Sequence, residues 1–162
     1  MQKVILALAL SGFLALSLFS CKSKKEDPTP SKTPEELAIE DLTGGSSQVW
    51  VIAGGGSVIR DGRSETNIYQ TFEITFTSGG NNKTYNTINS NDLFDANGNW
   101  SFVGANLDKI SLAGNKPASE REISYTRTGN DLRLVFSITV PGAELPNGAV
   151  AGNYTFNLKK KQ

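Results

Sequence analysis

Apolar and polar residues alternate with a period of two over most of the chain after residue 47. Residues 72–77 (Phe-Glu-Ile-Thr-Phe-Thr) alternate strictly. Successive side chains of a β-strand point to opposite faces, so this pattern predicts strands with one buried and one wet side. About eight such strands are expected, at Trp50/Ile52, 72–77, Tyr85/Thr87, Trp100/Phe102, Ile110/Leu112, 123–126, 131–138 and 154–159.

Glycine and asparagine separate these segments and predict tight turns, because both residues tolerate positive φ. The turn sequences include Asp61-Gly62, Gly79-Gly80-Asn81, Asn97-Gly98 and Gly129-Asn130. Strands with one wet face, joined by hairpins, favour antiparallel over parallel sheets. We therefore expect an all-β fold, either an antiparallel up-and-down eight-stranded barrel or a two-layer sandwich, with aromatic side chains in its core.

A short helix is predicted before the first strand. Thr33-Pro34-Glu35-Glu36 places a capping hydroxyl, a proline at the first helical position and a glutamate at the third, which is the capping-box pattern. Gly44-Gly45 supplies a stop. The helix is expected to span about residues 34–42.

The N-terminus has the pattern of an export signal. Lys3 precedes an uncharged apolar run over residues 4–19, which is short for a bilayer span of about 20 residues. The only cysteine, Cys21, follows this run and has no partner for an internal disulfide. Leu18-Phe19-Ser20-Cys21 resembles the lipobox of bacterial lipoproteins, which implies cleavage after residue 20 and a diacylglycerol on the Cys21 thiol.

Residues 21–32 are rich in charge and proline and are expected to form an extended tether between the signal peptide (1–20) and the domain (33–162). Lys25-Glu26-Asp27 resembles the signal that sends lipoproteins of the Bacteroidota to the cell surface. An ordinary solvated linker is the alternative.

The composition of the chain argues against nucleic-acid binding and against most hydrolase and metal-site functions. Sixteen basic residues balance sixteen acidic ones, so no positive field for nucleic acid is expected. The absence of histidine weakens most hydrolase and metal-site interpretations. Residues 95–99 offer oxygen ligands but lack the glycine and glutamate positions of a calcium loop, so we interpret them as a hairpin turn. We expect no catalytic residues, no metal, no cofactor and no enzymatic activity.

A family resemblance follows from the order of several short motifs. These are Leu42-Thr43-Gly44, Trp50, Phe72-Ile74-Phe76, residues 97–102 (Asn-Gly-Asn-Trp-Ser-Phe) and Ile110-Ser111-Leu112. Together they resemble the lipocalin-like lipoproteins of the Bacteroidota. The resemblance implies an eight-stranded antiparallel barrel behind a lipobox and tether, although Trp50 lies farther from the Leu-x-Gly motif than is usual in that family.

Two functional hypotheses result. In the first, the protein is held at the outer membrane by its lipid anchor, on the cell surface or the periplasmic leaflet. There it binds a small apolar or glycan ligand through the barrel mouth and loops, with Trp50, Phe94 and Tyr154 as contacts. In the second, it is a structural or accessory envelope protein that binds partner proteins through exposed loops.

Overall fold

A computed structural model describes residues 31–139 and 151–162, and one compact unit spans Lys32–Gln162. The signal peptide, Cys21 and nearly all of the tether lie outside the described residues. Within the described part the secondary structure consists of α1 (Pro34–Thr43), β1 (Ser47–Val51), β2 (Ser57–Arg60), β3 (Arg63–Ser64), β4 (Glu73–Gly79), β5 (Asn82–Ile88), β6 (Asn97–Phe102), β7 (Lys109–Leu112), β8 (Ile123–Thr128), β9 (Asp131–Ile138) and β10 (Gly152–Lys160).

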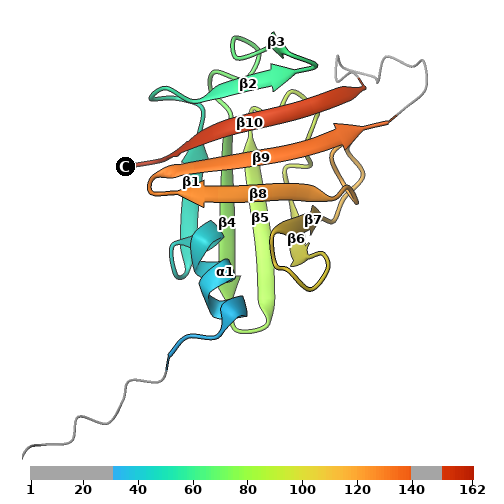
Figure 1. Cartoon of the computed structure of the whole chain (residues 1–162). Helices are drawn as coiled ribbons and strands as arrows, with labels where there is room; N and C mark the ends of the chain where they lie inside the picture. Colours follow the sequence, from blue (N-terminus) through green and yellow to red (C-terminus); the bar gives the residue numbers. More distant parts are fainter. Residues whose placement is uncertain (1–30, 140–150) are drawn as a thin grey trace, which may run out of the picture. The chain divides into compact units, whose positions relative to one another are not determined.

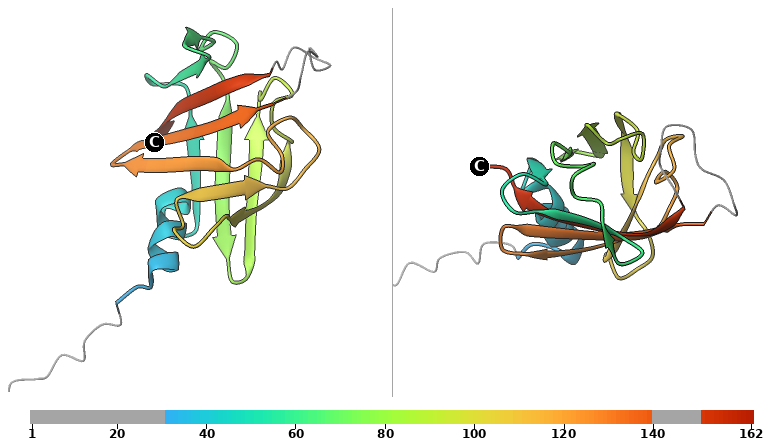
Figure 2. Two further views of the ribbon diagram at one scale, coloured as in Figure 1. Left: turned by 45° about the vertical axis from the view of Figure 1, so that its right-hand side comes forward. Right: turned by 90° about the horizontal axis from the view of Figure 1, so that it is seen from above.

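Eight of the strands form a closed antiparallel barrel. From β4 to β10 each strand pairs with its neighbours in the sequence, and β1 pairs with β4 on one side. The barrel closes where β1 also pairs with β10, with Trp50 opposite Lys160 and Val51 opposite Lys159. Strands β8–β10 run across β4 and β5 at a steep angle (Figure 1), and Figure 2 shows these two parts of the sheet from two further sides.

The remaining two strands extend the sheet beyond the barrel. Val51 lies opposite Lys159 and Ser57 opposite Asn157, so residues 52–56 of this segment face a single residue of β10. A hydrogen bond from the Gly56 amide to the Ile52 carbonyl (2.8 Å) closes the turn formed by residues 52–56. Strand β2 then continues along β10 and turns back as β3, which forms the edge of the sheet.

Helix α1 lies against one end of the barrel, and its two ends follow from the sequence. The Thr33 hydroxyl accepts a hydrogen bond from the Glu36 amide, and the Glu36 carboxylate accepts one from the Thr33 amide. These reciprocal bonds satisfy two backbone donors at the helix N-terminus. At the other end Gly44 adopts φ 62°, a left-handed conformation that glycine tolerates at little cost.

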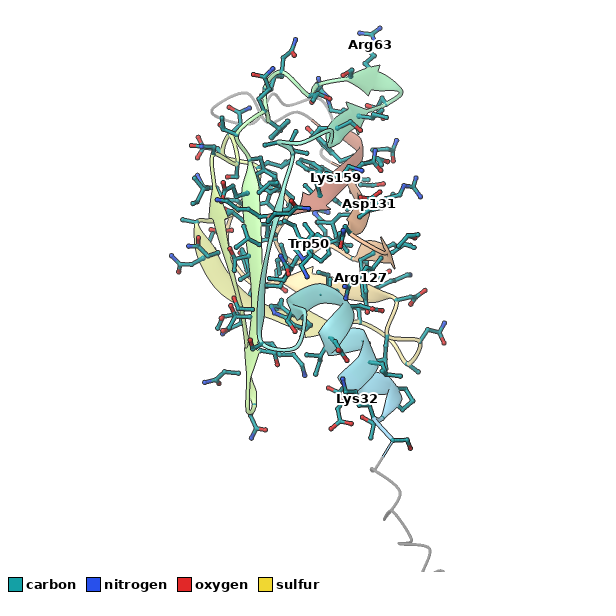
Figure 3. All side chains as sticks on the ribbon, turned by 90° about the vertical axis from the view of Figure 1, so that its left-hand side faces the viewer. Lys32, Trp50, Arg63, Arg127, Asp131 and Lys159 are labelled. Carbon is teal, nitrogen blue, oxygen red and sulfur yellow. The ribbon has the colours of Figure 1, made fainter. Side chains whose placement is uncertain are left out.

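Two side chains of the barrel donate hydrogen bonds to backbone carbonyls of α1, and Lys83 of β5 also pairs with the Glu35 carboxylate of the helix (2.9 Å). The Trp50 indole N–H donates to the Leu42 carbonyl (2.8 Å), and the Arg127 guanidinium donates to the Glu40 carbonyl (3.1 Å). The guanidinium carbon of Arg127 also lies 5.8 Å from the centroid of the Trp50 ring, within range of a cation–π interaction. Figure 3 shows Trp50 and Arg127 beside the helix. This end of the barrel is therefore covered by α1, Trp50 and Arg127.

The core is built from the inward-facing residues of every barrel strand, as strict alternation requires. On β9 the even-numbered residues from Leu132 to Ile138 are buried, and on β10 so are Tyr154, Phe156 and Leu158. Each large apolar side chain contributes about 1.5–3 kcal/mol when fully buried. The fold thus has a large aromatic and aliphatic core.

The predicted fold class is confirmed. The β1–β10 pairing makes the sheet a closed barrel rather than a two-layer sandwich, and the helix begins at Pro34 as expected. All eight predicted strands are present. The short strands β2 and β3 were not predicted, since they are two to four residues long.

One predicted turn is wrong. Asn97-Gly98 does not form a hairpin turn, because both residues belong to β6 and Gly98 pairs with Tyr85. The Tyr85 hydroxyl donates to the Ala113 carbonyl (2.9 Å). A Cβ atom on Gly98 would collide with that carbonyl oxygen and would lie 2.7 Å from Cε1 of Tyr85. The glycine is needed for a close approach inside the barrel, not for a turn.

We expect Gly98→Ala to lower the free energy of unfolding by about 1–3 kcal/mol, because the added methyl group overpacks this site and the obstructing Ala113 oxygen belongs to the backbone. Gly79→Ala is the matched control, since Gly79 also lies in a strand but has open space around its Cβ position. The control should leave the free energy unchanged or raise it by up to about 1 kcal/mol. Urea unfolding monitored by tryptophan fluorescence measures both, and equal effects would contradict this account.

Candidate functional site

The end of the barrel away from α1 is filled by aromatic side chains. This aromatic cluster consists of Tyr69, Phe72, Phe94, Phe136, Tyr154 and Phe156, each no more than 3% exposed. Strands β9 and β10 supply three of its members. The other three come from the segments between β3 and β4 and between β5 and β6.

Phe94 lies in the middle of the cluster, although it comes from a loop. Its ring centroid is 5.4 Å from that of Phe72 and 5.5 Å from those of Phe136 and Phe156. The Phe72 contact is stacked and the other two are edge-to-face, which are the favourable arrangements of aromatic pairs. The loop thus inserts a ring into the end of the barrel that lies away from α1.

The three residues predicted to contact a ligand are all buried. Trp50 is fully buried, Phe94 is 2% exposed and Tyr154 is 1% exposed. Phe94 and Tyr154 both belong to the aromatic cluster, whereas Trp50 bonds to α1 at the opposite end. The structure therefore brings two of the three into one cluster and places the third apart. Cys21, the predicted lipid attachment residue, lies outside the described residues.

A carboxylate fixes the loop that carries Phe94. Asp95 Oδ2 accepts hydrogen bonds from the backbone amides of Asn115 and Lys116 (both 2.9 Å) and from the Ser119 hydroxyl (2.6 Å). A Cβ atom on Gly114 would collide with this carboxylate. We call this set of bonds the Asp95 latch, because it fastens the loop between β5 and β6 to the loop between β7 and β8.

The latch favours the charged form of Asp95. Partial burial raises the pKa of this carboxyl group, but the bonds from Ser119, Lys116 and Asn115 and the nearby charge of Lys116 outweigh it. The pKa is therefore below the ordinary value of 3.8. A group whose pKa is depressed in the folded state adds stability above its unfolded pKa and loses that contribution as the pH falls through the folded value.

Buried tyrosines serve as hydrogen-bond donors. Burial raises the pKa of Tyr85 and of Tyr125 to about 12, and the pKa of Tyr69 is raised further for the same reason. The Tyr125 hydroxyl donates to the Leu107 carbonyl (2.6 Å). These phenols stay protonated near neutral pH, and the hydroxyls of Tyr85 and Tyr125 fasten neighbouring backbone carbonyls to the barrel wall.

The strand carboxylates are engaged in surface ion pairs. Glu73 pairs with Lys161 (2.7 Å), and Asp131 pairs with Lys159 (2.8 Å). Within residues 31–139 and 151–162 no three histidine, cysteine, aspartate or glutamate side chains group as metal ligands would. Each of these two carboxylates therefore forms a surface ion pair with a lysine.

An open groove of 560 Å³ lies beside the last strand. Its lining includes Gly54, Asn130, Asp131 and the lysines at positions 159–161. Lys159 and Lys161 are paired with carboxylates there. The groove is open to solvent, and Val51 and Ala53 line it together with these polar and charged residues.

No family model matches this chain, and no curated protein or solved structure matches it. The part of the chain that the structure describes contains no helix long and apolar enough to cross a membrane. The family resemblance therefore rests on the short motifs and on the closed barrel.

Sequence reasoning predicted an aromatic core, but it did not predict that Tyr69 and Phe94 belong to it, and it did not identify the latch. Tyr69 and Phe94 lie in loops, where a period-two pattern gives no indication of burial. The partners of Asp95 lie 20 to 24 residues farther along the chain, so no local motif signals the contact. The only available signal was the adjacent pair Leu93-Phe94 in an otherwise polar segment.

We expect Asp95→Asn to lower the free energy of unfolding by about 1–3 kcal/mol at neutral pH, because it removes charge-assisted hydrogen bonds. The difference from the unmodified protein should shrink as the pH falls below about 3.8, where Asp95 itself becomes protonated. Denaturant titrations over a range of pH measure this difference in the free energy of unfolding. Asp92→Asn, which changes the same loop but loses only a contact with the Lys116 side chain, should have a smaller effect, and a pH-independent difference would contradict the latch.

Proposed function

We propose that this protein is a lipid-anchored binding module of the bacterial outer membrane. Cys21 carries the anchor, residues 21–32 form the tether, and the barrel stands outside the bilayer. The support is the order of signal, cysteine and charged spacer in the sequence, followed at Pro34 by the capped start of α1. Two or more acyl chains, each contributing about 0.8 kcal/mol per buried methylene, suffice for stable anchoring.

The barrel binds its ligand on its outer surface. The barrel end where a ligand would enter is filled by six aromatic side chains, including the buried Phe94. A ligand pocket of the usual kind is a concave space of about 300–1,000 Å³, and the aromatic rings stand where the mouth would offer it. We therefore favour a glycan, which can be held on an exposed polar face, over an apolar molecule held inside.

The role is non-enzymatic in this proposal. Strand carboxylates that would be candidates for acid–base chemistry are paired with lysines, and the buried tyrosines are held protonated. A general acid or base works best with a pKa near the operating pH. We therefore propose that the protein binds its ligand without catalysing a reaction.

Immobilised full-length protein in detergent, exposed to envelope extract and to soluble polysaccharides, tests the binding role. Retention of a glycan, identified by sugar analysis after elution, is the expected result. A stoichiometric protein partner with no glycan would instead support the accessory-protein alternative and overturn the glycan proposal.

We expect Cys21→Ala to abolish incorporation of an alkyne-labelled fatty acid and to release the protein from the membrane fraction of bacteria that express it, since the thiol is the proposed acylation point. Ser23→Ala, two residues away in the spacer, should keep both the label and the membrane association. Gel fluorescence and fractionation measure these outcomes. A labelled Cys21→Ala protein would contradict the anchor.

A second candidate is an apolar ligand that displaces Phe94. The support is that Phe94 enters from a loop in which Asn89, Asn91 and Asp92 all adopt positive φ. The position of the Phe94 ring in the barrel end therefore depends on a strained segment and on the Asp95 latch. In this case the loop must move Phe94 out of the barrel end before the ligand binds. The free energy that this movement costs reduces the apparent affinity for the ligand.

The neutral fluorophore N-phenyl-1-naphthylamine tests the second candidate. If Phe94 can be displaced, the full-length protein should bind the probe with a stoichiometry of one, and Asp95→Asn should bind it more tightly, by about tenfold for each 1.4 kcal/mol removed from the opening cost. Asp92→Asn should bind as the unmodified protein does. The absence of saturable binding in all three proteins would exclude this candidate.

A further inference from the structure

The outer side of β1, β4, β5 and β6 carries two complete rows of uncharged side chains. The strand register aligns Ser47, Thr77, Thr84 and Asn99 in one row and Val49, Thr75, Asn86 and Asn97 in the next. We call these eight residues the neutral face. All are exposed or half-buried. Helix α1 lies on the other side of these strands, as Figure 3 shows where they are seen nearly edge-on.

Most polar groups of the neutral face are available to a ligand. Ser47 and Thr77 hydrogen-bond to each other (2.9 Å), and the Asn86 amide donates to the Ala96 carbonyl (2.8 Å). Within residues 31–139 and 151–162 the side chains of the other four polar members form no hydrogen bond with the protein; they are Thr75, Thr84, Asn97 and Asn99. Hydroxyl and amide groups can both donate and accept hydrogen bonds.

The lack of charge distinguishes this face from the outer side of β9 and β10. Protein surfaces typically contain about 25–35% charged residues, so eight positions would ordinarily include two or three. The outer side of β9 and β10 fits that expectation, with Asp131, Arg133 and Lys159. At the rim of the neutral face the first charge, Glu73, is neutralised by Lys161.

We propose that the neutral face is the docking surface for an uncharged, hydroxyl-rich polysaccharide chain. This inference rests on the proposed binding role, and it is independent of the lipid anchor. Uncharged groups cost less to desolvate than ionised ones. Serine, threonine and asparagine also lose less rotamer entropy on binding than lysine or arginine.

The sheet geometry gives the neutral face a regular spacing. Neighbouring strands lie about 4.8 Å apart, and alternate residues on one strand about 6.8 Å apart. The register therefore repeats donors and acceptors along two directions of the surface. A polymer of identical neutral units can meet such an array in several equivalent positions.

Other partners fit this surface less well. A protein interface needs an apolar centre with aromatic or large aliphatic anchors, and Val49 is the only aliphatic member of the neutral face. Nucleic acid and anionic lipids require lysine or arginine. Because the neutral face has no aromatic side chain for sugar stacking, each contact is weak. Binding should then depend on long chains and on many copies of the protein side by side.

Affinity electrophoresis of the full-length protein in detergent tests the proposal, in native gels containing dextran, mannan or galactomannan. At least one of these neutral polysaccharides should retard the protein. Thr84→Ala/Asn99→Ala, which removes two directly paired side chains, should weaken binding by about threefold to tenfold. Asn97→Asp, which adds charge without changing size, should weaken it similarly.

Thr126→Ala/Asn157→Ala is the control, because it makes the same chemical change on the outer side of β8 and β10; it also removes the hydrogen bond from the Asn157 amide to the Ser57 hydroxyl (2.9 Å), so its stability is measured beside its binding. It should bind within about twofold of the unmodified protein. Thermal unfolding of each variant checks that the fold is retained, and an unfolded double variant leaves Asn97→Asp as the deciding measurement.

Three results would overturn the proposal. These are the absence of retardation by all three polysaccharides, equal losses in the neutral-face and control variants, and a dimer in sedimentation experiments that Asn97→Asp dissociates. In the second case the binding role itself stands and only its location is wrong. In the first, the capture experiment with envelope extract decides whether the protein binds a charged glycan or a protein instead.

Discussion

The pairing of β1 with β10 is the constraint on which the rest of the structure depends. It joins the first and last strands of the barrel through residues 50–51 and 159–160, so every inward-facing side chain between them becomes part of one enclosed core. An open sheet of the same strands would expose unpaired backbone along two edges. Closure also places Trp50 beneath α1, and among the strands of residues 31–139 and 151–162 it leaves the short strand β3 at the end of the strand order.

A closed barrel does not by itself contain a cavity for a ligand. The small radius of an eight-stranded barrel can be filled by side chains, and here loops add rings to those of the strands. Phe94 and Tyr69 complete the packing of Phe156. The same loops are held by polar contacts outside the core, the Asp95 latch above all. With the core filled, every second residue of the barrel wall remains on the outer surface.

Much of the fold could be predicted because alternation is local. Strand positions, antiparallel order and the helix capping box depend on residues within a few positions of one another, and they were predicted correctly. The filled barrel end could not be predicted, since Phe94 is buried by residues from β9 and β10 that lie more than 40 positions away. Gly98 was misinterpreted for a related reason: its role depends on Tyr85 and Ala113, not on the adjacent asparagine. The neutral face likewise appears only once the register aligns its rows.

The attachment of α1 determines how mechanical load would pass through an anchored protein. A pull on the chain at Lys32 acts first on the helix, whose Glu40 carbonyl is held by Arg127 and whose Leu42 carbonyl is held by Trp50. These bonds reach β8 and β1, two strands far apart in the sequence, so tension is shared by both sides of the barrel. If the proposed anchor pulled on the chain, the helix would detach before any strand of the barrel was separated from its neighbours.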